Sequence, residues 1–100
     1  MNDILYHDVV YCRVMKDGNV SSPIPYEAPA YSGLTGGDTV IVDVGYGRAT
    51  AKVVSVSTVP LNSPVVTFGR VLKTVVYAPF DWSSIDEERK ERNAVEAEKA

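Results

Sequence analysis

The side chains that most often carry out chemistry are scarce in this chain, in which His7 is the single histidine and Cys12 the single cysteine. Their separation of five residues places them on opposite faces if they share a strand. A Cys–His catalytic pair is therefore not expected, and we interpret His7 as a partly exposed strand residue and Cys12 as a small buried hydrophobe. A structural zinc site needs about four Cys or His ligands. The sequence thus predicts neither an enzyme nor a bound metal or cofactor.

Glycines and carboxylates do not form a familiar site either. The glycines of residues 33–37 lack the lysine and hydroxyl of a phosphate loop, and those of residues 45–47 lack the strand-to-helix setting of a dinucleotide fingerprint. We interpret both clusters as turns. Asp38 and Asp43 point to opposite faces of a strand, so they are not an acid/base pair. Asp38 is expected to accept turn amides, and Asp43 to pair with a basic residue across a hairpin.

The residues that could bind a ligand are aromatic and basic. Tyr46, Arg48 and Lys52 fall on a predicted hairpin, and Tyr26 and Tyr31 on the segment before it. Aromatic rings can stack nucleic-acid bases while nearby cations contact phosphates. The alternative is that the tyrosines pack over a small core and the charges lie solvated at its rim.

The elements that must position these residues are β strands. Residues 36–59 hold two β-branched runs joined by a glycine turn, which is the signature of a hairpin. The apolar positions change parity near Val53 and Val54, which predicts a bulge or bend. Further strands are expected at residues 4–15 and 65–77, the second with a bend at Gly69. A segment at residues 20–31 contains three prolines, so it is expected to be an edge strand or an irregular arm with only partial pairing.

Residues 1–80 are expected to form one domain, a mainly β, five-stranded small barrel with Leu34 at one end of its core. Residues 81–100 are expected to form a charged helical tail, because Ser84 and Glu87 fit a capping box and opposite charges recur at i,i+4 spacing. Trp82 and Ile85 are expected to pin its first turn to the barrel. The tail carries seven acidic and four basic side chains, hence the whole net charge of −3.

Composition and charge indicate which binding partners and which compartment to expect. The first 80 residues hold six acidic and six basic side chains, and tight binding of nucleic acid usually requires a basic excess. No apolar run approaches the roughly 20 residues of a membrane span, and the start lacks an export signal. The single cysteine agrees with a reducing compartment. A cytoplasmic protein with no membrane association is expected.

An arm tyrosine, a loop leucine, Gly-Asp, a Val-rich strand, a glycine turn with a basic residue and a second Val-rich strand follow one another here. This order resembles the N-terminal 3′-DNA-end-binding domain of the primosomal helicase PriA, and the matching residues are Tyr26, Leu34, Gly37, Asp38, Val40, Val42, Gly45, Arg48, Val53, Val54 and Val56. The whole chain also resembles short phage and prophage proteins with such a barrel and a charged helix. The resemblance implies an SH3-like barrel and a phage origin. In the helicase family an Asp before the arm tyrosine helps hold the DNA end, whereas this chain has Ile24-Pro25-Tyr26 there.

Two functional hypotheses follow. The first is a non-enzymatic, phage-encoded interaction module whose barrel edge and acidic helix bind a protein partner or a second copy of the chain. The alternative is a weak single-stranded nucleic-acid-binding protein of the PriA N-terminal type that uses Tyr46, Arg48 and Lys52.

Overall fold

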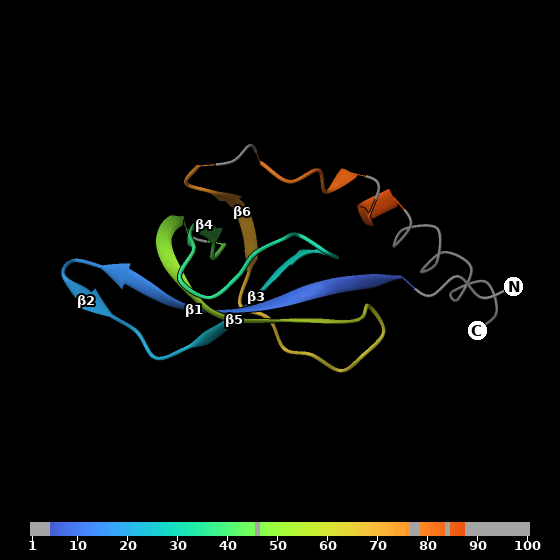
Figure 1. Ribbon diagram of the computed structural model, residues 1–100, viewed down its shortest axis with the longest axis horizontal. Coiled ribbons are helices and arrows are strands. Elements are labelled where there is room, and N and C mark those ends of the chain that lie inside the picture. Colours follow the sequence, from blue (N-terminus) through green and yellow to red (C-terminus); the bar gives the residue numbers. More distant parts are fainter. Residues whose placement is uncertain (1–4, 46, 77–78, 84, 88–100) are drawn as a thin grey trace, which may run out of the picture.

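The computed structural model describes residues 5–45, 47–76, 79–83 and 85–87 (Figure 1). The described residues form six strands: β1 (Tyr6–Lys16), β2 (Asn19–Val20), β3 (Ile24–Pro29), β4 (Thr39–Asp43), β5 (Arg48–Pro60) and β6 (Arg70–Thr74). The predicted mainly β fold is therefore confirmed. Helical backbone occurs at Ser83 and at residues 85–87, while Ser84 and the predicted i,i+4 charge pairs of residues 88–100 lie outside the described residues.

The sheet closes into a barrel. Its strands follow the order β2-β1-β3-β6-β4-β5, and a further antiparallel pairing joins β5 back to β1. β5 serves both neighbours because residues 48–52 pair with β4 and residues 50–60 pair with β1. Strands β1, β3, β4, β5 and β6 thus form the closed wall, and the two-residue strand β2 extends the β1 hairpin beyond it.

The predicted irregularity of β5 is present as a β-bulge. Tyr11 of β1 faces Ser55 and Cys12 faces Val53, so Val54 has no partner in the register. Ala51 and Val53 are buried, Val54 and Ser55 are both exposed, and Val56 packs against the core. The inward positions thus change from odd to even numbers, which is the parity change predicted from the sequence. A bulge bends a strand and increases its twist, and here it lets β5 curl from β4 towards β1.

Two tight turns join neighbouring strands. Asp17 and Gly18, between β1 and β2, both have positive φ, 51° and 79°, as a two-residue hairpin of the I′ kind requires. In the β4–β5 turn the Val44 N–H donates to the Gly47 carbonyl at 3.1 Å, and the Asp43 carboxylate accepts the Gly45 N–H at 2.9 Å. Asp38 accepts the Thr35 N–H at 3.0 Å, as predicted.

The expectation that the proline-containing segment forms an edge was wrong. β3 lies between β1 and β6, in register with β1 along all six residues and with β6 only at Glu27 and Arg70. The Pro25 carbonyl accepts the Phe68 N–H and the Glu27 N–H donates to Gly69, so the odd-numbered residues of β3 face β6. Pro25 and Pro29 share that side, so their missing N–H groups remove no hydrogen bond between β3 and β1.

Residues 65–69 are irregular, so the strand predicted from residue 65 begins only at Arg70. Gly69 passes close over the end of β4. A Cβ built on Gly69 would overlap the carbonyl oxygen of Asp43, which is why the chain needs glycine at this position.

The core lies inside the barrel and consists of Val10, Cys12, Tyr26, Ala28, Leu34, Val40, Val42, Ala51, Val53 and Val71. Leu34 is buried at the core as predicted. Cys12 is also buried, as predicted, and burial raises the pKa of its thiol to about 12. Asp8 is buried at one end of the barrel, where its carboxylate accepts the backbone N–H groups of Tyr31 and Ser32 and the hydroxyls of Ser32 and Thr58.

The described residues after 78, namely 79–83 and 85–87, run along the outside of the barrel and are called the strap below (Figure 1). Phe80 packs against the core and donates its N–H to the Leu72 carbonyl of β6 at 3.3 Å. β6 pairs with β3 at a single position, so the strap adds a second contact along that side of β6.

Candidate functional site

A groove of about 690 Å³ opens at one end of the barrel. Three segments meet there: the β1–β2 hairpin, the start of β3 and the β4–β5 turn. The lining residues are Val14, Met15, Lys16, Asp17, Asn19, Val20, Ser21, Ile24, Tyr26, Val44, Gly47, Arg48, Ala49 and Thr50. The groove lies where hairpin β1–β2 projects past the closed wall of the barrel (Figure 1).

The inner part of the groove is aliphatic. Val14, Ile24, Val44 and Ala49 are partly buried and pack against the barrel core while also lining the groove. Tyr26 lines it too, but only 1% of this residue is exposed, so little of its ring reaches the open space. An apolar side chain that entered the groove would therefore gain contacts with aliphatic carbon rather than with an aromatic face.

The rim of the groove is polar and carries more positive than negative charge. Lys16 is the last residue of β1 and Arg48 is the first residue of β5, and both are exposed. Asp17 supplies the one carboxylate among the lining residues. The groove thus offers an aliphatic interior beside two cations. This combination suits a ligand with an apolar group next to negative charge.

The structure brings together two of the five residues proposed from the sequence. Tyr26 and Arg48 both line the groove. Tyr31 follows the far end of β3, is 79% exposed and has a positive φ of 57°. Lys52 is exposed on β5, opposite Arg13 of β1, and does not line the groove. Tyr46 lies outside the described residues.

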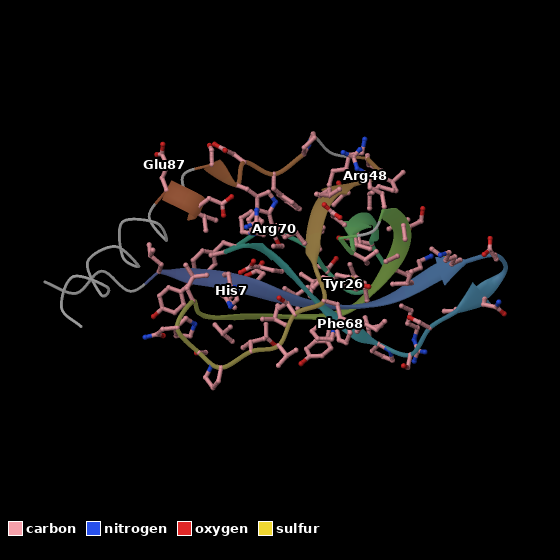
Figure 2. All side chains as sticks on the ribbon, turned by 180° about the vertical axis from the view of Figure 1, so that it is seen from behind. His7, Tyr26, Arg48, Phe68, Arg70 and Glu87 are labelled. Atoms are coloured by element: carbon pink, nitrogen blue, oxygen red, sulfur yellow. The ribbon has the colours of Figure 1, made fainter. Side chains whose placement is uncertain are left out.

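A second cluster of polar side chains lies between the outer face of the barrel and the strap (Figure 2). His7 Nδ1 donates to the Glu27 carboxylate at 2.5 Å, and Arg70 Nε lies 4.0 Å from the other oxygen of Glu27. His7 is only 5% exposed, so its interpretation as a partly exposed strand residue was wrong. The reason is that β3 places a buried carboxylate beside it and the strap covers this face.

Arg70 connects this cluster to the strap. Its guanidinium donates to both carboxylate oxygens of Asp86, at 2.8 and 3.1 Å, and stacks over the Trp82 ring at 4.5 Å. The hydrogen bond with Asp86 is the main cause of a raised pKa at Arg70. Within the part of the chain that the structure describes, His7 Nε2 and Trp82 Nε1 are buried without a hydrogen-bond partner. The predicted anchoring of the first helical turn through Trp82 is thus achieved, with Arg70 as its support.

The comparisons with known proteins give no relative: no family model, no curated protein and no solved structure matches this chain.

The described residues also contain no helix of the length and apolar character needed to cross a membrane.

Proposed function

We propose that this chain is a non-enzymatic interaction module whose groove binds an apolar side chain of a protein segment, with acidic neighbours of that side chain at Lys16 and Arg48. One observation supports this function above the others: an aliphatic interior and a basic rim occur in the same groove. The volume of about 690 Å³ falls within the roughly 300–1,000 Å³ of small-ligand pockets, which is room for a side chain but not for a folded element.

Weak binding of single-stranded nucleic acid is the second candidate. Arg48 and Lys16 beside Tyr26 supply the cation and aromatic types that such sites combine. A stacking platform needs an exposed ring face, and Tyr26 is 1% exposed. Residues 1–80 also lack a basic excess, because their six basic side chains are balanced by six acidic ones. We therefore place protein binding first.

We further propose that the barrel is of the SH3-like kind and that the chain is phage-encoded and works in the cytoplasm. The closed five-stranded wall supports the first point. The resemblance of the barrel residues to the PriA N-terminal domain and to phage proteins supports the second. A free cysteine buried in the core supports the third, because cytoplasmic thiols stay reduced.

A peptide selection tests the proposed function. The full chain is used to select binders from a random peptide library, and we expect peptides with an aliphatic residue next to Asp or Glu. Arg48→Glu should weaken their binding about tenfold, because attraction to the rim becomes repulsion. Lys52→Glu is the matched control, since it makes the same change on the same strand outside the groove. Selected peptides that bind equally well to Arg48→Glu would show that the groove is not the site.

Fluorescence anisotropy with a labelled oligothymidine tests the second candidate. Affinity that falls steeply as salt is raised, and that Arg48→Glu reduces while Lys52→Glu does not, would favour nucleic acid as the groove ligand. Affinity that is absent at low salt would remove this candidate.

A further inference from the structure

The last described residues of the strap, 85–87, lie away from the groove (Figure 2). Arg70 donates hydrogen bonds to Asp86 of the strap and lies beside Glu27 of β3. Glu27 is hydrogen-bonded to His7, near the start of β1. The groove is lined by Val14, Met15 and Lys16, at the other end of the same strand. Figure 2 shows Glu87 near one end of the described molecule and Arg48 nearer its middle.

The sequence beyond the strap contains the chemistry that the groove accepts. Residues 94–98 are Ala-Val-Glu-Ala-Glu, and Val95 is the one large aliphatic residue after Ile85. Glu96 and Glu98 lie one and three positions after Val95. An aliphatic side chain beside two carboxylates complements an aliphatic groove beside two cations.

The distance favours the groove of another molecule. Val95 lies eight positions after Glu87, and even fully extended this stretch spans at most about 28 Å. β1 alone covers about 30 Å from His7 to Lys16 at roughly 3.3 Å per residue. The segment would therefore have to be almost fully extended to reach Lys16 in its own groove, whereas no such limit applies between two copies.

We infer that the groove of one copy binds residues 94–98 of a second copy, with Val95 in the aliphatic interior and Glu96 and Glu98 at the rim with Lys16 and Arg48. This inference rests on the proposed function and names its ligand. Because the donor segment and the groove are different parts of the chain, each contact is heterologous, and copies join either reciprocally in a dimer or head to tail. One aliphatic side chain and two exposed ion pairs give a weak contact, with a Kd on the order of 1 mM.

Charge reversal with rescue tests this pairing in the full chain. Sedimentation equilibrium between about 0.05 and about 2 mM brackets the expected Kd, and the average mass should rise across this range. Lys16→Glu with Arg48→Glu, and separately Glu96→Lys with Glu98→Lys, should each shift the rise to about fivefold higher concentration. All four changes together should restore it to within about twofold, because the charges are complementary again. Lys52→Glu should leave it unchanged.

Two outcomes would overturn the inference. The first is a mass that rises but is insensitive to these reversals, and the second is a chain that remains a monomer throughout while a labelled peptide of residues 91–100 fails to bind. In the second case the selected library peptides separate the two claims. If they still bind in a manner that requires Arg48, the proposed function stands and only the identity of the ligand is wrong. If they do not bind either, both claims fail.

Discussion

Arg70 contacts a buried carboxylate on the barrel and a more exposed one on the strap, and substitution can show which contact matters more for stability. The side chain of Glu27 is 9% exposed, whereas those of Asp86 and Arg70 are 39% and 37% exposed. We predict that Arg70→Met destabilises the protein considerably more than Asp86→Asn. Methionine keeps most of the apolar length of arginine and asparagine keeps the shape of aspartate, so both changes remove mainly charge.

The expected losses in the free energy of unfolding follow from how exposed each carboxylate partner of Arg70 is. Asp86→Asn removes a bidentate ion pair at a partly exposed site, where such pairs contribute about 0.5–1 kcal/mol. Arg70→Met removes that pair, a cation–π contact with Trp82 of about 0.5–1 kcal/mol, and the guanidinium 4.0 Å from the buried Glu27 carboxylate. Weakening the compensation of a buried charge costs about 1–3 kcal/mol. We therefore expect about 2–5 kcal/mol for Arg70→Met.

Urea unfolding followed by far-UV circular dichroism gives the free energy of unfolding of each variant, and Trp82 fluorescence reports on the strap in the same samples. Lys73→Met on the same strand is the matched control, because Lys73 is exposed, and it should change stability by less than about 0.5 kcal/mol. Equal losses for Arg70→Met and Asp86→Asn would refute the reasoning, since the proximity of Arg70 to Glu27 would then contribute nothing to stability.

Three further predictions concern the barrel itself. Gly69→Ala should cost more than about 2 kcal/mol in thermal or urea unfolding, because its methyl group would overlap the Asp43 carbonyl. Gly33→Ala, where φ is positive but no neighbouring atom lies close to the new methyl group, should cost only about 1 kcal/mol. Cys12 should resist iodoacetamide in the native protein and react once urea unfolds it. The free energy of unfolding should fall by about 1.4 kcal/mol per pH unit between pH 9 and 12, because the unfolded thiol loses its proton near 9.0 while the folded thiol keeps it to about 12. Cys12→Val should remove this dependence on pH. Asp8→Ala should cost about 2–4 kcal/mol by urea unfolding, because two backbone N–H groups and two hydroxyls lose their acceptor, and a loss below about 1 kcal/mol would mean that water replaces the carboxylate there.

Local rules account for the parts of the fold that sequence predicted. Glycine at positions 45 and 47 and alternating valines in β4 specify a hairpin within a few residues of chain, so they can be read without knowledge of the rest. The change of apolar parity at Val53 and Val54 is likewise a property of one strand, and it predicted the bulge. Leu34 was recognisable because it is the one apolar residue in a polar loop.

The features that sequence did not predict all depend on pairing between distant segments. The interior position of β3 could not be inferred from its prolines, because the rule on missing N–H groups does not say which neighbour each side faces. His7, Glu27 and Arg70 meet only because β3 lies between β1 and β6. The isolated Glu27 within an otherwise apolar strand was the available signal, since a carboxylate at such a position requires a partner.

The candidate site shows the same division. Residue chemistry was enough to single out Tyr26 and Arg48, but only closure of the barrel shows that these two share a groove while Tyr31 and Lys52 lie elsewhere. The aliphatic interior of the groove was not expected. Val14, Ile24 and Val44 come from three strand ends that are adjacent only in the folded barrel.

The single registered pair between β3 and β6 has a consequence for how the protein is made. While residues 70–86 are still inside the ribosome, a nascent chain can already form β1, β3, β4 and β5, yet one side of β3 then lacks its neighbour β6. Open strand sides recruit other chains. The interval between emergence of β5 and emergence of Trp82 is therefore the period of synthesis in which this barrel is most exposed to misassociation.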